Sequence, residues 1–273
     1  MHPTWAERYY RAIDAVHEAG RHALEYFDRP VHVEWKENAS PVTVADREAE
    51  LVLRNSLLGR FAQDGFLGEE FGEKQGTSGF RWIIDPIDGT RNFVRGIPLW
   101  GTLVGLEFEG DPIAGICYFP ALHKTYRALR GDGAYRDGRK IHVSTVSKLA
   151  DSQIFFSGLG WLVSGPVKTG FLELVDQTQR QRGFGDCYAF CLIAQGSGEA
   201  MVEYGVHAWD VAALMPIIEE AGGVMTDWDG QRNLHRPDVL ASNKLLHQEV
   251  LALLKKGQGD FQPGVLQHGE KVT

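Results

Sequence analysis

The spacing of apolar residues changes at about Val146, and this change limits the folds that the chain of 273 residues can adopt. Before Val146, apolar residues recur at helical spacing in two segments and then form short runs bounded by Gly, Pro and Asp. The predicted helices cover residues 5–27 and 43–61, and the predicted strands cover 65–68, 81–84, 99–108 and 113–119. Turn sequences at 110–112, 131–133 and 137–138 predict hairpins, so a largely antiparallel sheet is expected in this half.

After Val146, helical and strand patterns alternate along the chain. The predicted helices cover 166–177, 186–195, 208–221 and 243–254, and the predicted strands cover 153–157, 199–202, 223–226 and 239–241. The chain is therefore expected to be an α/β (α+β) protein. We expect an α+β half at 1–145, an α/β half at 146–256 and a loose polar tail at 257–273.

The composition narrows the class of protein and its partners. Hydrophobic residues make up 43% and charged residues 23%, the balance of an ordinary globular protein rather than a collagen, a coiled coil or a disordered chain. Asp and Glu number 36 against 28 Lys and Arg, and no dense basic stripe occurs, so nucleic acid is not an expected partner.

The sequence also predicts where the protein resides. It contains no run of 18 apolar residues, so no membrane partner is expected, and charges interrupt the N-terminal segment where a signal peptide would be apolar. The three cysteines Cys117, Cys187 and Cys191 are odd in number and lack the CxxC spacing of a zinc site. Reduced thiols in a cytoplasmic protein are the expectation.

An acidic turn, Asp85-Pro86-Ile87-Asp88-Gly89-Thr90, directly follows the apolar strand predicted at 81–84. Pro86 is expected to end the strand, and Gly89 permits a backbone conformation that other residues resist. Asp85 and Asp88 can converge there, and like charges so close favour a cation held by oxygen ligands, such as Mg²⁺ or Mn²⁺. If Gly89 and Thr90 open a short helix, their N–H groups offer an anion site. The alternative is a plain Asp-Pro and Asp-Gly turn.

Three further acidic features lie where predicted strands or helices begin or end. Glu69, in Gly68-Glu69-Glu70, follows a strand; Asp46 has capping-box spacing to Thr43; Asp210 falls in the first turn of an apolar helix. Each has a structural explanation by itself, as a solvated loop, a helix cap or a charge that favours the helix dipole. Their occurrence together with the acidic turn favours a functional interpretation.

The chain resembles the inositol monophosphatase superfamily of metal-dependent phosphomonoesterases over about residues 5–255. The matching segments read PVTVAD at 41–46, GEE at 68–70, WIIDPIDGTRNF at 82–93, WDVA at 209–212 and EAGG at 220–223. The longest of these, WIIDPIDGT, is among the most specific signatures of that family. The resemblance implies a layered α/β/α/β/α sandwich, consistent with the two halves described above.

The resemblance also implies roles for individual residues. It implies metal ligands at Glu69, Asp85, the Ile87 carbonyl, Asp88 and Asp210. Two or three Mg²⁺ are implied, with Asp85 bridging two of them and Glu69 helping to hold a third, weaker ion. Thr90, supported by Asp46, would act with Glu69 to position and activate the attacking water. Backbone N–H groups of Gly89 and Thr90 would hold phosphate oxygens, and a homodimer is expected because relatives are often dimers.

This chemistry needs the metal ions before the substrate, because carboxylates alone would repel a phosphate monoester dianion. Bound ions would bridge phosphate oxygens, lower the pKa of a water and stabilise the departing alkoxide. Haloacid-dehalogenase phosphatases carry Asp-x-Asp, whereas Asp85 and Asp88 are three apart, and no P-loop sequence occurs. An alternative of another class is a catalytically silent binding or regulatory subunit with this fold, but none of the matched ligands is lost.

Substrate choice is expected to depend on the second half. Gly185-Asp186-Cys187-Tyr188 resembles the histidinol-phosphate phosphatases of the same superfamily. Asp186 and Glu203 could pair with the ammonium and imidazole of histidinol phosphate, an intermediate of histidine biosynthesis. Alternatively, Asp186 only caps the following helix, and Glu203 is not discriminating because inositol-type enzymes have a similar acid. Histidinol phosphate is the leading expected substrate, and myo-inositol monophosphate is the alternative.

Overall fold

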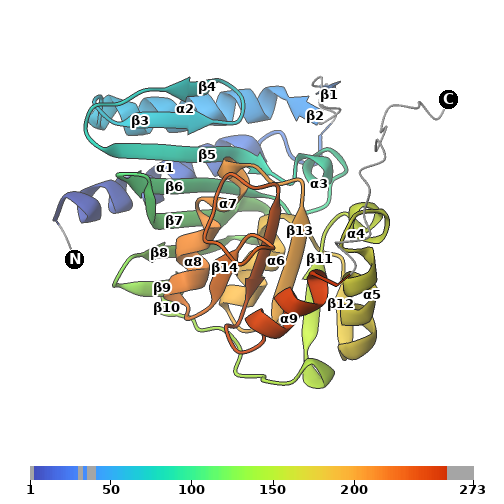
Figure 1. Cartoon of the computed structure of the whole chain (residues 1–273). Coiled ribbons are helices and arrows are strands. Elements are labelled where there is room, and N and C mark those ends of the chain that lie inside the picture. The colour runs from blue at the N-terminus through green and yellow to red at the C-terminus, as the bar shows by residue number, and fades with distance from the viewer. Residues whose placement is uncertain (1–2, 30–32, 36–40, 257–273) are drawn as a thin grey trace.

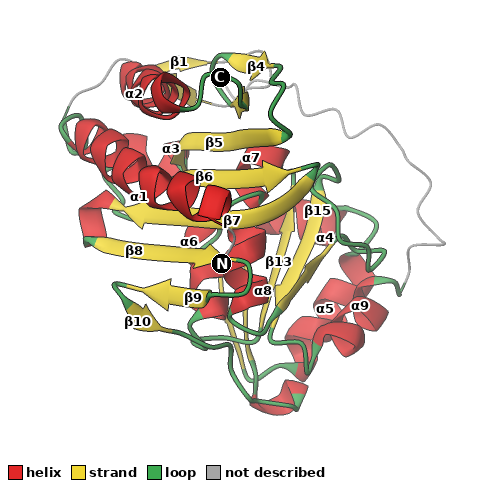
Figure 2. Cartoon of the chain, turned by 90° about the vertical axis from the view of Figure 1, so that its left-hand side faces the viewer, coloured by secondary structure: helices red, strands yellow, loops and turns green. Residues whose placement is uncertain are grey.

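The computed structural model describes residues 3–29, 33–35 and 41–256, in which two β-sheets alternate with layers of helices (Figures 1 and 2). The larger sheet has the order β10-β9-β8-β7-β6-β5-β3-β4, and its neighbouring strands are antiparallel except the parallel pair β3 and β5. Its strands are β3 (Gly65–Gly68), β4 (Gly72–Lys74), β5 (Phe80–Asp88), β6 (Gly101–Phe108), β7 (Asp111–Phe119), β8 (Lys124–Leu129), β9 (Gly133–Arg136) and β10 (Arg139–Lys140). The predicted, largely antiparallel sheet is thus confirmed.

The smaller sheet is mixed and comes from the second half of the chain. Its order is β12-β11-β13-β15-β14, with β11 parallel to both of its neighbours. Its strands are β11 (Gln153–Phe156), β12 (Arg180–Arg182), β13 (Ala200–Tyr204), β14 (Val224–Thr226) and β15 (Asp238–Ser242). A separate short pair, β1 (Val33–Trp35) and β2 (Pro41–Thr43), precedes α2.

Helices form the outer and central layers of the fold (Figure 1). The helices α1 (Pro3–Leu24) and α2 (Val44–Arg60) cover one face of the larger sheet. The central layer between the sheets contains α6 (Asp186–Ala194), α7 (Ala208–Val211) and α8 (Leu214–Glu220). The outer layer on the smaller sheet contains α4 (Leu159–Ser164), α5 (Lys168–Gln177) and α9 (His247–Leu254). Short elements are α3 (Thr90–Val94), η1 (Pro120–Leu122) and η2 (Leu149–Asp151). The α/β/α/β/α sandwich is confirmed.

The central layer packs tightly against the larger sheet, and this contact places α7 beside the acidic turn. A Cβ atom added to Gly115 of β7 would lie 1.8 Å from the Ala213 carbonyl oxygen, between α7 and α8. Glycine in β7 therefore permits the close approach of the helix junction to the sheet. One apolar core lies between the sheets and joins the two halves, so the division at residues 145 and 146 stays a prediction.

Two predictions about individual elements are wrong. Pro86 does not end its strand, because β5 continues to Asp88 through a shift of register between Asp85 and Asp88, where proline's missing N–H is tolerated. The helix predicted at 208–221 is divided into α7 and α8. Pro216 lies in the first turn of α8, where no N–H donor is needed, and it could not continue a helix from α7.

Smaller differences concern element boundaries. The structure adds β4, α4, β12 and the β1–β2 pair to the predicted elements. Helix α9 begins at His247 because the Asn243 side chain accepts the Leu246 N–H in a turn. The predicted tail at 257–273 lies outside the described residues. None of the described helices is long and apolar enough to cross a bilayer.

A buried histidine ties α9 to the smaller sheet. Nδ1 of His247 lies 2.7 Å from the Ser242 hydroxyl, and Nε2 lies 3.0 Å from the Thr226 hydroxyl. The Thr226 hydroxyl donates to the Asp227 carbonyl, so the imidazole donates from Nε2 and accepts at Nδ1, as a neutral ring does. Burial lowers the pKa of His247 to about 4.

This lowered pKa predicts a loss of stability in acid. Because the unfolded state binds the proton first, the stabilisation from His247 is complete above the unfolded pKa of about 6.5 and is lost as the pH falls towards 4. When the pH is lowered from about 8 to about 5, protonation of His247 should reduce the free energy of unfolding by about 2 kcal/mol. Urea unfolding of wild type and His247→Gln at both pH values checks this. The difference in free energy of unfolding between the two proteins should be smaller at about pH 5 than at about pH 8 by that amount. A difference that does not change with pH would contradict it.

Candidate active site

A cleft of about 420 Å³ lies where the ends of β3, β5 and β13 meet the beginnings of α3, α6 and α7. Its lining includes every residue that the sequence singled out as a metal or substrate ligand. These residues are Glu69, Asp85, Ile87, Asp88, Gly89, Thr90, Asp186, Glu203 and Asp210. Asp46 does not line the cleft and lies behind it on α2.

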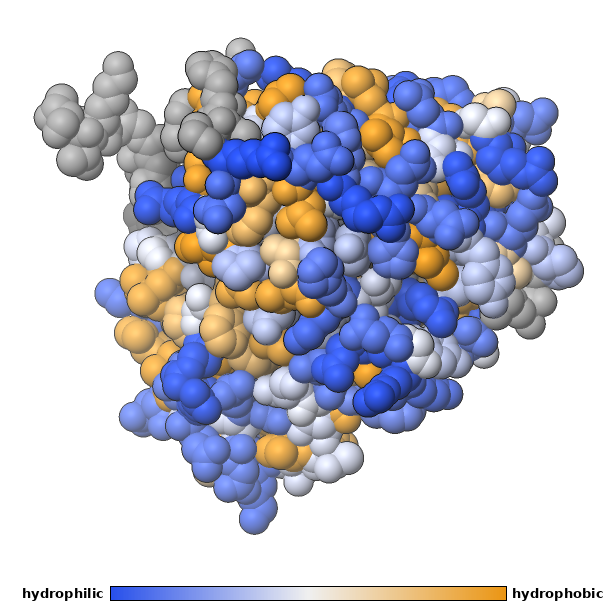
Figure 3. Space-filling view, turned by 180° about the vertical axis from the view of Figure 1, so that it is seen from behind, coloured by the Kyte–Doolittle hydropathy of each residue, from blue (hydrophilic) through white to orange (hydrophobic). Residues whose placement is uncertain are grey.

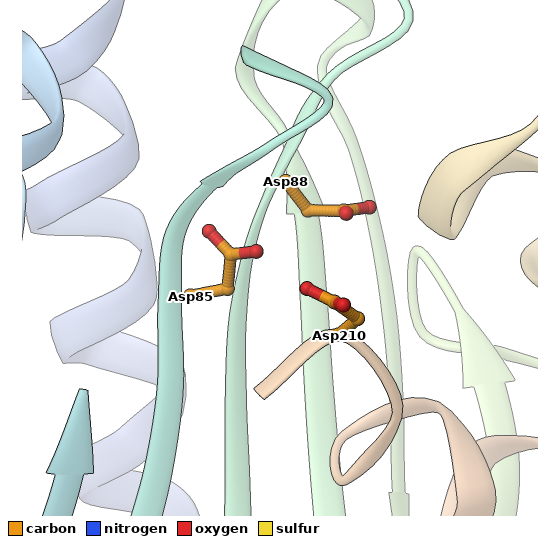
Figure 4. A group of neighbouring side chains, drawn as sticks. All are labelled: Asp85, Asp88 and Asp210. Carbon is orange, nitrogen blue, oxygen red and sulfur yellow. The ribbon is translucent and has the colours of Figure 1, made fainter. Parts of the chain in front are cut away.

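Three carboxylates converge in this cleft from both halves of the chain. Oxygen atoms of Asp85, Asp88 and Asp210 all lie within 4.8 Å of one another (Figure 4). Asp85 and Asp88 lie on either side of the register shift in β5, which turns both side chains to the same side. Asp210 comes from the first turn of α7, where its Oδ2 accepts the His207 N–H at 2.6 Å.

The electrostatics of these carboxylates favour a cation. Burial, followed by the charges of Glu69 and Asp88, raises the pKa of Asp85 well above its usual range. Burial and then the charges of Asp186 and Asp210 raise the pKa of Asp88 in the same way. Carboxylates that repel one another in a buried site prefer a divalent cation between them, and an oxygen-only set suits Mg²⁺ or Mn²⁺. The residues present therefore fit the metal that the sequence predicts.

Glu69 and Ile87 lie at the margin of this cluster. Glu69 follows β3 and acts on Asp85 through its charge and a side-chain hydrogen bond, but it is not one of the three residues whose oxygens all lie within 4.8 Å of one another. Ile87 lines the cleft, and its carbonyl accepts the Thr90 hydroxyl at 3.0 Å. Both residues can contribute an oxygen ligand beside Asp85.

Asp46 and Thr90 lie together behind the cluster. The predicted capping box is present, since Oδ2 of Asp46 accepts both the N–H and the hydroxyl of Thr43, at 2.7 and 2.6 Å. Oδ1 lies 3.4 Å from the Thr90 hydroxyl, which is closer to the Ile87 carbonyl. Burial raises the pKa of Asp46 to about 7, against the lowering effect of the Thr43 hydrogen bonds. Asp46 is therefore both a helix cap and a neighbour of Thr90.

The short helix predicted after the acidic turn is present as α3. Gly89 precedes it at φ 85°, in the left-handed region, and provides no side chain to cap the first N–H groups. Residues at the start of α3 line the cleft beside the carboxylates, and N–H groups left without a cap there can bind an anion once the acidic charge is neutralised.

Two more acids line the cleft close enough to the cluster for their charges to act on it. Glu203 of β13 is 7% exposed, and its Oε2 atom has no hydrogen-bond partner among the described residues. Burial and the charge of Asp186 raise its pKa well above the usual range. Asp186 begins α6 at φ 50°, and burial followed by the Asp210 charge raises its pKa to about 6. Asp186 is thus ionised near neutral pH and available to a cation.

Asn92 is a site residue to which the sequence assigned no role. Its Nδ2 donates to the Leu99 carbonyl at 2.8 Å and to Oδ2 of Asp186 at 3.0 Å. The alternative in which Asp186 only caps its helix is not supported, because Gly185 is the N-cap and Asp186 is bonded to Asn92 instead. Helix α3 has five residues, too few for periodicity to indicate which face Asn92 would present.

The layered α/β fold places an oxygen-only carboxylate cluster beside a helix start that has no side-chain cap. This arrangement is typical of proteins that hold divalent cations next to a bound anion. The model of the inositol monophosphatase family matches residues 5–258, and the chain belongs to this family. It is thus a phosphomonoesterase of that type.

Relatives support this assignment. A histidinol-phosphatase of Chlorobaculum parvum is 38% identical over 91% of this chain and 97% of that protein. A histidinol-phosphatase of Mycobacterium tuberculosis is 41% identical over 83% of this chain and 89% of that protein. The crystal structure of extragenic suppressor protein suhB from Bartonella henselae has a TM-score of 0.86 and 31% identity, covering 91% of this chain and 98% of that one.

Proposed function

We propose that the chain is a Mg²⁺-dependent phosphatase that hydrolyses histidinol phosphate. The observation that carries this proposal is that one cleft is lined both by a carboxylate cluster for metal and by two further acids, Asp186 and Glu203. The similarity to histidinol-phosphatases over most of the chain supports the same substrate.

The chain's own residues would bind the ions and place the reacting groups. Asp85, Asp88 and Asp210 would hold two Mg²⁺, and Glu69 with the Ile87 carbonyl would complete the ligands, with a third ion near Glu69. Such ions supply positive charge to the phosphate and the leaving oxygen, and they lower the pKa of water. Thr90 and Glu69 would orient that water for in-line attack, and Asp46 would orient Thr90. The N–H groups of Gly89 and Thr90 would bind phosphate oxygens.

Asp186 and Glu203 would recognise the cationic part of the substrate. Histidinol carries an ammonium and an imidazole; the ionised Asp186 would bind such a group with a charge-assisted hydrogen bond, and Glu203 would add a hydrogen bond beside it. Asn92 fixes one oxygen of Asp186 and leaves the other for the ligand. The unpartnered oxygen of Glu203 offers a second acceptor.

A second candidate substrate is myo-inositol monophosphate. The unpartnered Glu203 oxygen would equally accept a sugar hydroxyl, so this residue favours neither ester. Asp186 separates the two, because inositol offers it no positive charge.

The function is tested by release of inorganic phosphate from histidinol phosphate. We expect release with Mg²⁺, loss of release on adding EDTA, and recovery when Mg²⁺ is restored in excess, with Mn²⁺ as an alternative ion. No release from histidinol phosphate or from a panel of other monoesters would favour the catalytically silent subunit instead.

We also propose that the protein is a cytoplasmic homodimer. Hydrophobic side chains gather on the surface near α4 and α5, at the left of the rear view (Figure 3), and Leu159, Trp161 and Leu172 are exposed there. The three cysteines are free and buried, consistent with reduced thiols. Light scattering after size-exclusion chromatography tests the dimer: a monomer mass at micromolar concentration would contradict it.

A further inference from the structure

Helix α2 presents two buried carboxylates towards the active site. Asp46 and Glu50 lie four residues apart, on one face of the helix, and are 1% and 0% exposed. Asp46 lies next to Thr90, whereas Glu50 contacts a different segment and has no role in the function proposed above.

Glu50 binds the turn that carries Glu69. Its Oε2 accepts the Glu70 N–H at 2.7 Å, and its Oε1 accepts the Phe71 N–H at 3.1 Å. Each oxygen of one carboxylate thus fixes one backbone donor directly after Glu69. Two backbone hydrogen bonds also compensate for burying the carboxylate, which would otherwise be costly.

The residue before Glu69 shows how closely Glu50 fits this turn. A Cβ atom on Gly68 would lie 2.0 Å from Oε1 of Glu50 and 2.5 Å from its carboxyl carbon. Any side chain at Gly68 would therefore push Glu50 away from the turn or the turn away from α2. Glycine at this position and glutamate on α2 form a matched pair.

We propose that Glu50 is a positioning residue that holds Glu69 at the metal cluster through the backbone of residues 70 and 71. Helix α2 would then align both groups that place the attacking water, Thr90 through Asp46 and Glu69 through Glu50. This inference rests on the proposed function, because it takes Glu69 as a metal ligand.

The test replaces Glu50 by Gln, which keeps the shape but turns an NH₂ group towards one of the two backbone donors. Outer residues that orient metal ligands typically change metal affinity by about 10- to 100-fold. We expect Glu50→Gln to weaken Mn²⁺ binding about tenfold, measured by electron paramagnetic resonance titration, and to raise the Mg²⁺ concentration for half-maximal activity equally.

Glu220→Gln is the matched control. Glu220 also accepts two backbone N–H groups, from Gly131 at 2.9 Å and Gly133 at 2.8 Å, in a turn that does not line the cleft. It should lower the unfolding temperature without changing Mn²⁺ affinity. If Glu50→Gln does not fold, Gly68→Ala tests the same contact from the other side and should weaken Mn²⁺ binding in the same way.

The outcomes separate this inference from the proposed function. The role of Glu50 alone would be overturned if the wild type binds Mn²⁺ and hydrolyses histidinol phosphate while Glu50→Gln or Gly68→Ala keeps the Mn²⁺ affinity of the wild type. An equal loss of Mn²⁺ affinity in Glu220→Gln would overturn it as well. Absence of Mn²⁺ binding to the wild type would overturn both.

Discussion

Replacing Asp85 by Asn should lower Mg²⁺-dependent kcat/KM for histidinol phosphate at least about 1,000-fold, equivalent to about 4 kcal/mol of transition-state stabilisation. Asp85 lies at the centre of the cluster, next to Glu69, Asp88 and Asp210, and is 2% exposed. An amide of the same shape removes the negative charge that holds a cation there. Steady-state phosphate release over a range of Mg²⁺ concentrations measures the effect.

Thermal unfolding separates this loss of metal from a loss of fold. In EDTA, Asp85→Asn should be at least as stable as wild type, because it relieves repulsion between buried carboxylates. Added Mg²⁺ should raise the unfolding temperature of wild type and not that of the variant. The control Asp176→Asn changes an exposed residue of α5 and should behave as wild type. Near-normal turnover by Asp85→Asn would contradict the metal assignment.

Replacing Asp186 by Asn should raise KM for histidinol phosphate about 10- to 100-fold. This factor corresponds to the free energy that a hydrogen bond to a charged group contributes to binding. KM for myo-inositol 1-phosphate should change by less than about threefold, because that ester carries no cation for Asp186 to bind. The Asn side chain can still accept from Asn92, so its position in the cleft is retained. Initial rates with both esters, at about pH 7.5 where Asp186 is ionised, measure the difference.

A matched variant at Glu203 completes this comparison. Glu203→Gln should affect both esters, since its unpartnered oxygen can accept from an ammonium or a hydroxyl. If Asp186→Asn changes KM for the two esters equally, Asp186 does not recognise positive charge.

Much of the site could be predicted because its residues lie next to local sequence patterns. Asp46 belongs to a capping box and Asp210 lies in a first helical turn, and the structure has both in those positions. Asp85 and Asp88, expected directly after an apolar strand, lie in the last part of strand β5 itself. A strand end or a helix start is a defined place on the fold, so carboxylates located there could be expected to meet.

The rest depends on contacts that no local pattern encodes. The bond from Asn92 to Asp186 joins residues 94 positions apart, and the contact of Glu50 with the Glu69 turn depends on how α2 packs on β3. The register shift that carries β5 past Pro86 arises from pairing with β6, which a strand sequence alone does not reveal. Such features are set by tertiary packing rather than by propensity.

The most direct measurement of the proposed function is a competition between histidinol phosphate and myo-inositol 1-phosphate, present together with the wild-type enzyme and Mg²⁺. With the two esters at equal concentrations, the ratio of initial product formation rates gives the ratio of kcat/KM values. A cleft lined by Asp186 as well as by the carboxylate cluster should favour histidinol phosphate at least about tenfold, and EDTA should stop both reactions. Equal use of the two esters, a preference for inositol phosphate, or turnover that persists in EDTA would contradict it.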